Sequence, residues 1–283
     1  MIRFGPSGNS KEFYEKGYKR TVQAPEWLAS QGLTAYEYSF GRGINLSDET
    51  ASEIAAQAKL FDVQVSVHAP YYINFANPSD EMAEKSYNYV LNSCKKVALL
   101  GGERVIFHPA SVGKMQRADA VALTHKRIEA LVDRIYLNGM QDFTFCPETM
   151  GKINQIGDLA EVVEFCKIDK CLVPTVDFGH LNARTYGSLK TKDDYERLIV
   201  YMLENLGHER VDKMHVHFSK IEFSQGGEVK HLTFEDTMFG PDFLPLAQVL
   251  KQYDLNNLVV ICESDGTQSA DAVAMKNMYL SVK

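Results

Sequence analysis

Eight short apolar runs alternate with longer stretches that carry apolar residues at helical spacing. The runs are rich in β-branched and aromatic residues and lie at residues 2–5, 35–39, 64–68, 104–108, 143–147, 172–177, 213–218 and 258–263. The stretches between them predict helices at 46–61, 79–100, 117–137, 156–166, 192–206, 242–253 and 270–282. Strands alternating with helices favour an α/β fold, and the number of strands predicts a (β/α)₈ barrel. An open doubly wound sheet is the alternative.

No linker, repeat or low-complexity tract interrupts this alternation, so we expect residues 1–283 to form a single barrel domain. The longest irregular stretch is 219–241, which contains Gly226-Gly227 and Gly240-Pro241. A long loop after a barrel strand usually has a functional reason.

Composition excludes some classes of protein. Hydrophobic residues make up 45% and charged residues 24%, as in ordinary soluble domains. The net charge of -7 argues against a protein that binds nucleic acid over its whole surface. The five cysteines form no Cys-x-x-Cys pair, which indicates reduced thiols. We find neither a signal peptide nor a bilayer-spanning stretch, so we expect a cytoplasmic protein without a membrane partner.

Side chains that can bind metals stand at or near the ends of six of the apolar runs. They are His68, His108, Glu148, Asp177, His180, His215 and Glu263. A parallel barrel places the carboxyl ends of all its strands on one rim, so we expect these side chains to meet in one pocket. Neutral imidazole and carboxylate bind Zn²⁺, Mn²⁺ or Fe²⁺. The sequence therefore predicts a metal centre.

Each of these residues also has an ordinary structural interpretation. A lone histidine at a strand end is often a hydrogen-bonding residue, and a buried carboxylate such as Glu148 or Glu263 can belong to an ion pair. Asp177 and His180 are separated by Gly179, where the backbone can turn sharply. His215 and His217 are two residues apart on a strand, so both could face the pocket, or His217 could contact substrate. The absence of a P-loop or G-x-G-x-x-G motif gives no indication of a nucleotide cofactor.

Taken in order, the motifs resemble a known family. H-A-P-Y-Y-I-N, F-H-P-A-S, P-E-T-M-G-K, D-F-G-H, H-V-H-F-S-K and C-E-S are similar to those of the endonuclease IV type of apurinic/apyrimidinic endonuclease. That type belongs to a wider barrel superfamily shared with xylose-isomerase-like sugar isomerases and epimerases. The resemblance covers about residues 60–265 and implies a barrel with two or three zinc ions that cuts DNA on the 5′ side of abasic sites.

The resemblance also implies a distribution of ligands. The first ion would be held by His68, His108 and Glu148, and the second by Glu148, Asp177, His215 and Glu263. The third would be held by His180 with help from the loop, where Glu228-Val229-Lys230-His231 stands in place of the family's Asp-x-His pair. Glu228 and His231 are therefore the expected loop ligands. Mn²⁺ or Fe²⁺ would suit the same donors.

The same resemblance implies roles around the metals. Glu148 and Glu263 would be catalytic, and Tyr71, His217 and Lys220 would contact the DNA. In a sugar isomerase or epimerase, the alternative activity, one metal would suffice and Glu148 and Glu263 would act as acid and base. A non-enzymatic metal-binding or DNA-binding module is a third interpretation, although seven ligands exceed the four of a closed structural site. The sequence indicates no oligomeric state.

Overall fold

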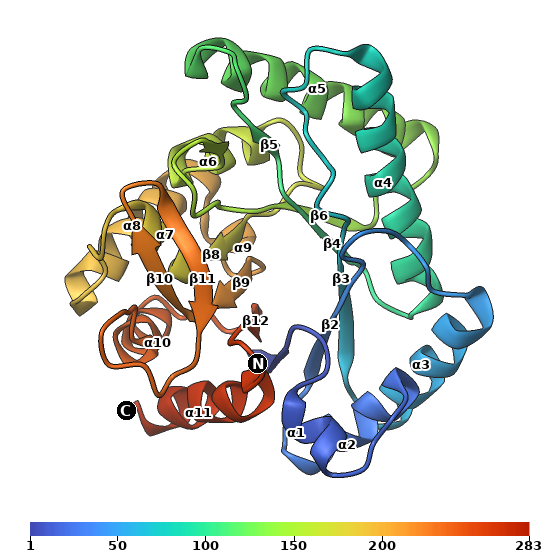
Figure 1. Ribbon diagram of the computed structural model, residues 1–283, viewed down its shortest axis with the longest axis vertical. Helices are drawn as coiled ribbons and strands as arrows, with labels where there is room; N and C mark the ends of the chain where they lie inside the picture. The colour runs from blue at the N-terminus through green and yellow to red at the C-terminus, as the bar shows by residue number, and fades with distance from the viewer. Residues whose placement is uncertain (283) are drawn as a thin grey trace.

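A closed ring of eight parallel strands forms the centre of the protein. The computed structural model describes residues 1–282, and Figure 1 shows the ring nearly end-on with helices around it. The barrel strands are β1 (Arg3–Pro6), β2 (Ala35–Ser39), β3 (Gln64–His68), β4 (Arg104–Phe107), β6 (Thr144–Pro147), β8 (Thr175–Asp177), β9 (His215–Phe218) and β12 (Val259–Cys262). The predicted barrel is thus confirmed, and every predicted strand is present with bounds that differ by at most three residues.

Two four-stranded sheets make up the ring, in the orders β1-β12-β9-β8 and β2-β3-β4-β6. Parallel bridges close the two seams, Ser7 to Glu37 on one side and Glu148 to Thr175 on the other. At the first seam β1 passes so close to β2 that a Cβ on Gly5 would lie 1.7 Å from the carbonyl oxygen of Ala35. Only glycine permits this approach, so Gly5 is a requirement of barrel closure.

Helices cover the outside of the ring. They are α1 (Lys11–Glu15), α2 (Ala24–Ser30), α3 (Asp48–Leu60), α4 (Asp80–Leu99), α5 (Arg117–Leu137), α6 (Leu159–Lys167), α7 (Phe178–Arg184), α8 (Lys192–Leu206), α9 (His208–Val211), α10 (Phe243–Gln252) and α11 (Gln268–Ser281), with a short 3₁₀ turn η1 (Thr21–Gln23). The Ser47 hydroxyl accepts a hydrogen bond from the Thr50 amide at the start of α3, as expected for an N-cap. The short helices α1, α2, α7 and α9 were not predicted, because they have too few turns for a clear apolar stripe.

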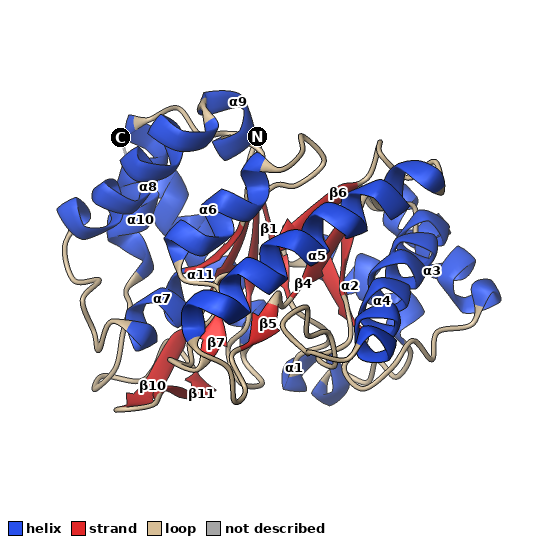
Figure 2. Cartoon of the chain, turned by 90° about the horizontal axis from the view of Figure 1, so that it is seen from above, coloured by secondary structure: helices blue, strands red, loops and turns tan. Residues whose placement is uncertain are grey.

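One prediction about the chain between β9 and α10 was wrong. The expected irregular stretch 219–241 contains an antiparallel hairpin of β10 (Lys220–Ser224) and β11 (Gly227–Leu232). Gln225 and Gly226 form its two-residue turn, and Gly227, the first residue of β11, has a positive φ of 86°. Figure 2 shows the hairpin projecting from the end of the barrel opposite the N-terminus. A second small pair, β5 (Ala110–Ser111) with β7 (Gln155–Ile156), lies at the same end.

The remaining features agree with an ordinary packed interior. All five cysteines are free and buried, as expected for small apolar residues.

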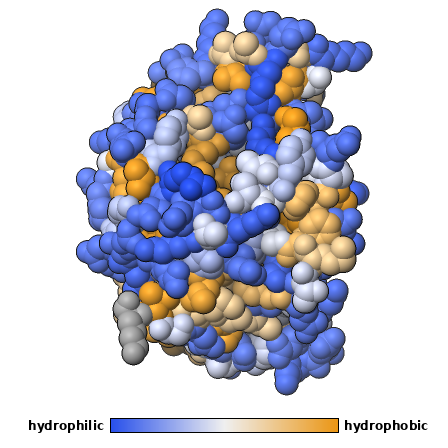
Figure 3. Space-filling model, turned by 90° about the vertical axis from the view of Figure 1, so that its left-hand side faces the viewer, coloured by the Kyte–Doolittle hydropathy of each residue, from blue (hydrophilic) through white to orange (hydrophobic). Residues whose placement is uncertain are grey.

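The face in Figure 3 is largely hydrophilic, with hydrophobic residues in separate groups. Within residues 1–282, no helix combines the length and apolar character needed to cross a bilayer.

Candidate metal centre

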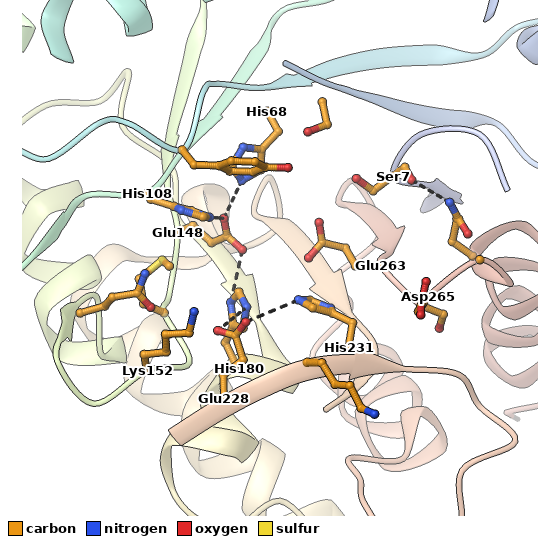
Figure 4. A pocket seen from close by; sticks show the side chains of 18 residues that line it. Ser7, His68, His108, Glu148, Lys152, His180, Glu228, His231, Glu263 and Asp265 are labelled. Atoms are coloured by element: carbon orange, nitrogen blue, oxygen red, sulfur yellow. Dashed lines mark hydrogen bonds and ion pairs between the residues drawn. The ribbon is translucent and has the colours of Figure 1, made fainter. Parts of the chain in front are cut away.

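The carboxyl ends of the barrel strands surround a pocket of about 640 Å³. His68 is the last residue of β3, and His108, Glu148 and Glu263 directly follow β4, β6 and β12. Asp177 ends β8 and its side chain caps α7, whose first turn carries His180. Figure 4 shows side chains from these separate strands pointing toward one another. Six of the seven side chains that were expected on one rim therefore converge there, and His215 does not.

The first group contains His68, His108 and Glu148, whose ligand atoms all lie within 4.8 Å of one another. His68 donates its Nδ1 hydrogen to the carbonyl oxygen of Ala69 at 2.8 Å. The lone pair of a neutral ring is then on Nε2, which lies 3.0 Å from Glu148 Oε2. His108 Nε2 lies 3.2 Å from the same oxygen. A lone pair facing a carboxylate leaves a place for a cation between them, or for a proton.

The second group is Glu148, Asp177, His217 and Glu263. His217 Nδ1 lies 3.0 Å from Glu148 Oε1 and 3.6 Å from Glu263 Oε2. The sequence prediction placed His215 here, and the structure corrects it. Both histidines point into the barrel, but two residues along a strand are about 7 Å of rise, so His215 lies deeper.

Instead, His215 contacts Glu37, a residue that the sequence analysis missed. His215 Nε2 lies 2.9 Å from Glu37 Oε2, and both side chains are fully buried. Burial opposes ionisation of Glu37, but His217 and His215 outweigh it and hold its pKa below the usual range. The sequence contained one signal for Glu37: a charged residue in the middle of a run whose other residues predict a buried strand.

The third group is His180, Glu228 and His231. His180 donates from Nδ1 to the carbonyl oxygen of Thr149 at 2.9 Å, which leaves Nε2 facing Glu228 Oε2 at 3.4 Å. His231 Nδ1 lies 2.8 Å from the hydroxyl oxygen of Ser219. The hairpin thus supplies Glu228 and His231, the two residues expected from this part of the chain.

Backbone contacts fix the hairpin against the barrel. The Glu228 amide donates to the Gly151 carbonyl oxygen at 3.1 Å, and an antiparallel bridge joins Lys152 to Gly227. A Cβ on Gly151 would lie 2.7 Å from the Glu228 Cβ and 2.9 Å from the His180 ring. Glycine at position 151 therefore allows the hairpin to approach His180.

The donor set fits a divalent cation. Asp177 is fully buried, and its Oδ2 accepts no hydrogen bond from the described residues, although His180 Nδ1 lies 3.2 Å away. A buried carboxylate oxygen without a hydrogen-bond donor is costly unless a cation neutralises it. Neutral imidazoles and carboxylates are also the donors that Zn²⁺, Mn²⁺ and Fe²⁺ take. The structure thus contains candidate metal-binding groups.

The carboxylates of the second group lie close enough to change one another's ionisation. Burial raises the pKa of Asp177 to about 6, against the opposing effect of His180 and with further help from Glu263 and Glu148. Burial opposes ionisation of Glu148 as well, but the imidazoles of His217, His108 and His180 hold its pKa well below the ordinary value. Three carboxylates packed this closely repel one another, which a bound cation would relieve.

Of the three predicted substrate contacts, one lines the pocket and two do not. Tyr71 lines the pocket with 55% of its surface exposed, and its ring lies over His108 with centroids 6.2 Å apart. Lys220 is turned away, because its Nζ donates to the Asp236 carbonyl oxygen at 2.5 Å outside the pocket. His217 is fully buried, so it lies below the surface that a substrate would touch.

Two pocket-lining lysines were missed by the sequence analysis. Lys152 follows Glu148 by four residues, and Lys230 lies on the hairpin beside His231. Neither position stands out in the sequence, because exposed lysines are common. The one sequence feature that could have indicated Lys152 was its place in P-E-T-M-G-K, four residues after Glu148.

Comparison with known proteins supports both the barrel fold and the resemblance to endonuclease IV. A family model described as xylose isomerase-like TIM barrel matches residues 25–278. An uncharacterized protein of Methanocaldococcus jannaschii is 29% identical over 260 residues, with 91% of each chain covered. A probable endonuclease 4 of Aquifex aeolicus is 25% identical over 225 residues, with 78% of each chain covered.

Solved structures show the same barrel. Endonuclease IV from Thermus thermophilus has a TM-score of 0.69 at 21% identity, with 98% of both chains covered. A D-tagatose 3-epimerase-like protein has a TM-score of 0.72 at 18% identity, covering 98% of this chain and 97% of its own. The resemblance to endonuclease IV within a wider barrel superfamily is thereby confirmed, and at these identities the two structures show the fold alone.

Proposed function

Because this chain belongs to the xylose isomerase-like TIM barrel family, we propose that it is a metal-dependent phosphodiesterase that cuts DNA on the 5′ side of abasic sites. The observation that carries the proposal is the presence of three ligand groups at one pocket, two of which share Glu148. A single-metal isomerase needs only one of them. Relatives named probable endonuclease 4 support the same class of reaction.

We assign the cations as follows. His68, His108 and Glu148 would hold one, Glu148, Asp177, His217 and Glu263 a second, and His180, Glu228 and His231 a third. Zinc is the metal we propose, with Mn²⁺ or Fe²⁺ suited to the same donors. Bound divalent cations supply Lewis acidity, which activates water at neutral pH and neutralises charge on phosphate oxygens.

The protein's own contribution is positioning. We propose catalytic roles for Glu148 and Glu263. As ligands, they would hold the cations in place beside the scissile phosphate. Lys152 and Lys230 line the pocket and would attract the phosphates on either side. The exposed face of Tyr71 offers a surface for a base or sugar to stack on. An abasic site suits such a pocket because its stacking is already reduced.

The test uses the purified protein with its metal content determined. A duplex with one stable abasic analogue should be incised on its 5′ side, and the matched intact duplex should not. Glu148→Gln should abolish incision, whereas Glu164→Gln, which changes an exposed carboxylate on α6 paired with Lys167, should not. Lack of incision with zinc, manganese or iron would refute the proposal.

A sugar isomerase or epimerase is the second candidate, and one observation favours it. Glu148, Asp177, His217 and Glu263 alone provide three carboxylates and one imidazole, a set that suits a single divalent cation. Glu148 and Glu263 would then exchange a proton with a carbon next to a carbonyl. About one metal per chain, with turnover of a ketose and none of DNA, would favour this candidate.

A further inference from the structure

A fully buried carboxylate lies inside the barrel below the metal-binding pocket. Glu37 projects from β2 and is 0% exposed. Three side chains point at it: the Ser66 hydroxyl donates to Oε2 at 3.2 Å, His215 Nε2 lies 2.9 Å from the same oxygen and His217 Nε2 lies 3.3 Å from it. Glu37 does not line the pocket, so it is outside the proposed catalytic machinery.

His217 stands between this carboxylate and the second ligand group. Its Nε2 faces Glu37, and its Nδ1 lies 3.0 Å from Glu148 Oε1. A neutral imidazole carries one N–H and one lone pair. If the hydrogen is on Nε2 and is donated to Glu37, the lone pair on Nδ1 faces the pocket. If it is on Nδ1, the ring cannot act as a ligand there.

We propose that Glu37 is a positioning residue that holds His217 in the tautomer with its lone pair on Nδ1, ready to bind a cation with Glu148, Asp177 and Glu263. A hydrogen bond from the far nitrogen of a ligand histidine to a carboxylate fixes both the tautomer and the ring orientation. The inference rests on the proposed metal centre but is independent of the substrate.

His215 completes the arrangement by contacting the same oxygen of Glu37 as His217. Its ring approaches the ring of His217 with centroids 5.1 Å apart at an angle of 76°. The hydrogen bond that His215 offers to Glu37 Oε2 restrains the carboxylate where His217 needs it. This explains why a second histidine lies two residues before the ligand and one level deeper.

The test compares cation affinity in Glu37→Leu, Glu37→Gln and the unchanged protein. Apo protein is titrated with Co²⁺ in competition with a chelator, and cadmium-113 NMR resolves the individual sites. Glu37→Leu should weaken one cation about 10- to 100-fold and leave the others unchanged. Glu37→Gln retains an acceptor oxygen and should restore most of the affinity.

A double variant separates positioning from a general structural effect. If Glu37 acts through His217, Glu37→Leu should add little to the loss already caused by His217→Asn. Asp271→Asn, a buried carboxylate at the start of α11, serves as the control and should leave cation affinity unchanged. Additive losses in the double variant would overturn the inference.

A measurement on the unchanged protein covers the case in which Glu37→Leu does not fold. Nitrogen-15 NMR of the zinc-loaded protein should find the His217 hydrogen on Nε2, with the signal assigned from His217→Asn. A hydrogen on Nδ1 would overturn the inference and remove His217 from the second ligand group, but it would leave the first and third groups unaffected. A protein that binds no divalent cation at all would instead refute the proposed function.

Discussion

His180 Nε2 lies 3.4 Å from Glu228 Oε2, which brings an imidazole of the barrel against a carboxylate of the hairpin. The two residues come from separate elements, α7 and β11. The third ligand group therefore depends on the hairpin's position, and changes in the hairpin should affect this group alone.

We expect Glu228→Gln to lose the cation of the third group, because an amide oxygen lacks the charge that a carboxylate gives a ligand. Elemental analysis after gel filtration should find about one ion per chain fewer than in the unchanged protein. Glu235→Gln changes an exposed carboxylate after the same hairpin and is the matched control. An unchanged metal count in Glu228→Gln would contradict the assignment.

Tyr71 should contribute to binding of DNA and not to folding. It is exposed at the pocket, so Tyr71→Ala should weaken binding by about 1–3 kcal/mol, the usual contribution of one stacked base. That corresponds to roughly 5- to 150-fold in Kd, measured by fluorescence anisotropy with an abasic duplex. Tyr72→Ala removes the neighbouring exposed ring, which lies toward Tyr89, and should bind almost as well. Equal losses in both variants would show that Tyr71 has no special role.

Gly5→Ala should destabilise the barrel. The added methyl group would overlap the Ala35 carbonyl, and backbone on both sides of the seam limits relaxation. We expect the free energy of unfolding to fall by about 3 kcal/mol or more, measured in urea. Gly226→Ala, in the hairpin turn, is the control, because its Cβ would meet nothing closer than the Ser224 hydroxyl at 3.7 Å. A Gly5→Ala protein of unchanged stability would refute the tight seam.

Removal of divalent cations should lower the melting temperature. Without them the carboxylates of Glu148, Asp177 and Glu263 repel one another in a buried setting. Zinc at one hundred times its dissociation constant stabilises a folded protein by about 2.7 kcal/mol per site. Differential scanning calorimetry with chelator and with zinc measures the shift, and a variant with His68→Ala should give a smaller one. The same melting temperature in both conditions would argue against a metal centre.

The alternation of strands and helices predicted an α/β fold, because each run carries the composition of a buried strand. The number of strands and the metal-binding residues at their ends favoured a barrel over an open doubly wound sheet. The convergence of His68, His108, Glu148 and Glu263 then followed from topology, since parallel strands in a barrel end on one rim. Both arguments depend on periodicity and order, which a sequence displays directly.

Other features depend on depth and direction, which periodicity does not encode. His215 and His217 share one face of β9, and only their height in the barrel decides which reaches the pocket. Lys220 was expected at the pocket, but it is the first residue of β10 and its Nζ donates to the Asp236 carbonyl oxygen outside the pocket. Glu37 was missed because its partners lie across the barrel, 178 and 180 residues away in sequence.

The hairpin makes the third ligand group a separable part of the pocket. It lies between β9 and α10 and carries Glu228 and His231, whereas the other candidate ligands lie on ring strands, directly after them or, for His180, on α7. Removal of this one segment would therefore take away two of the three ligands of that group and leave the first and second groups complete.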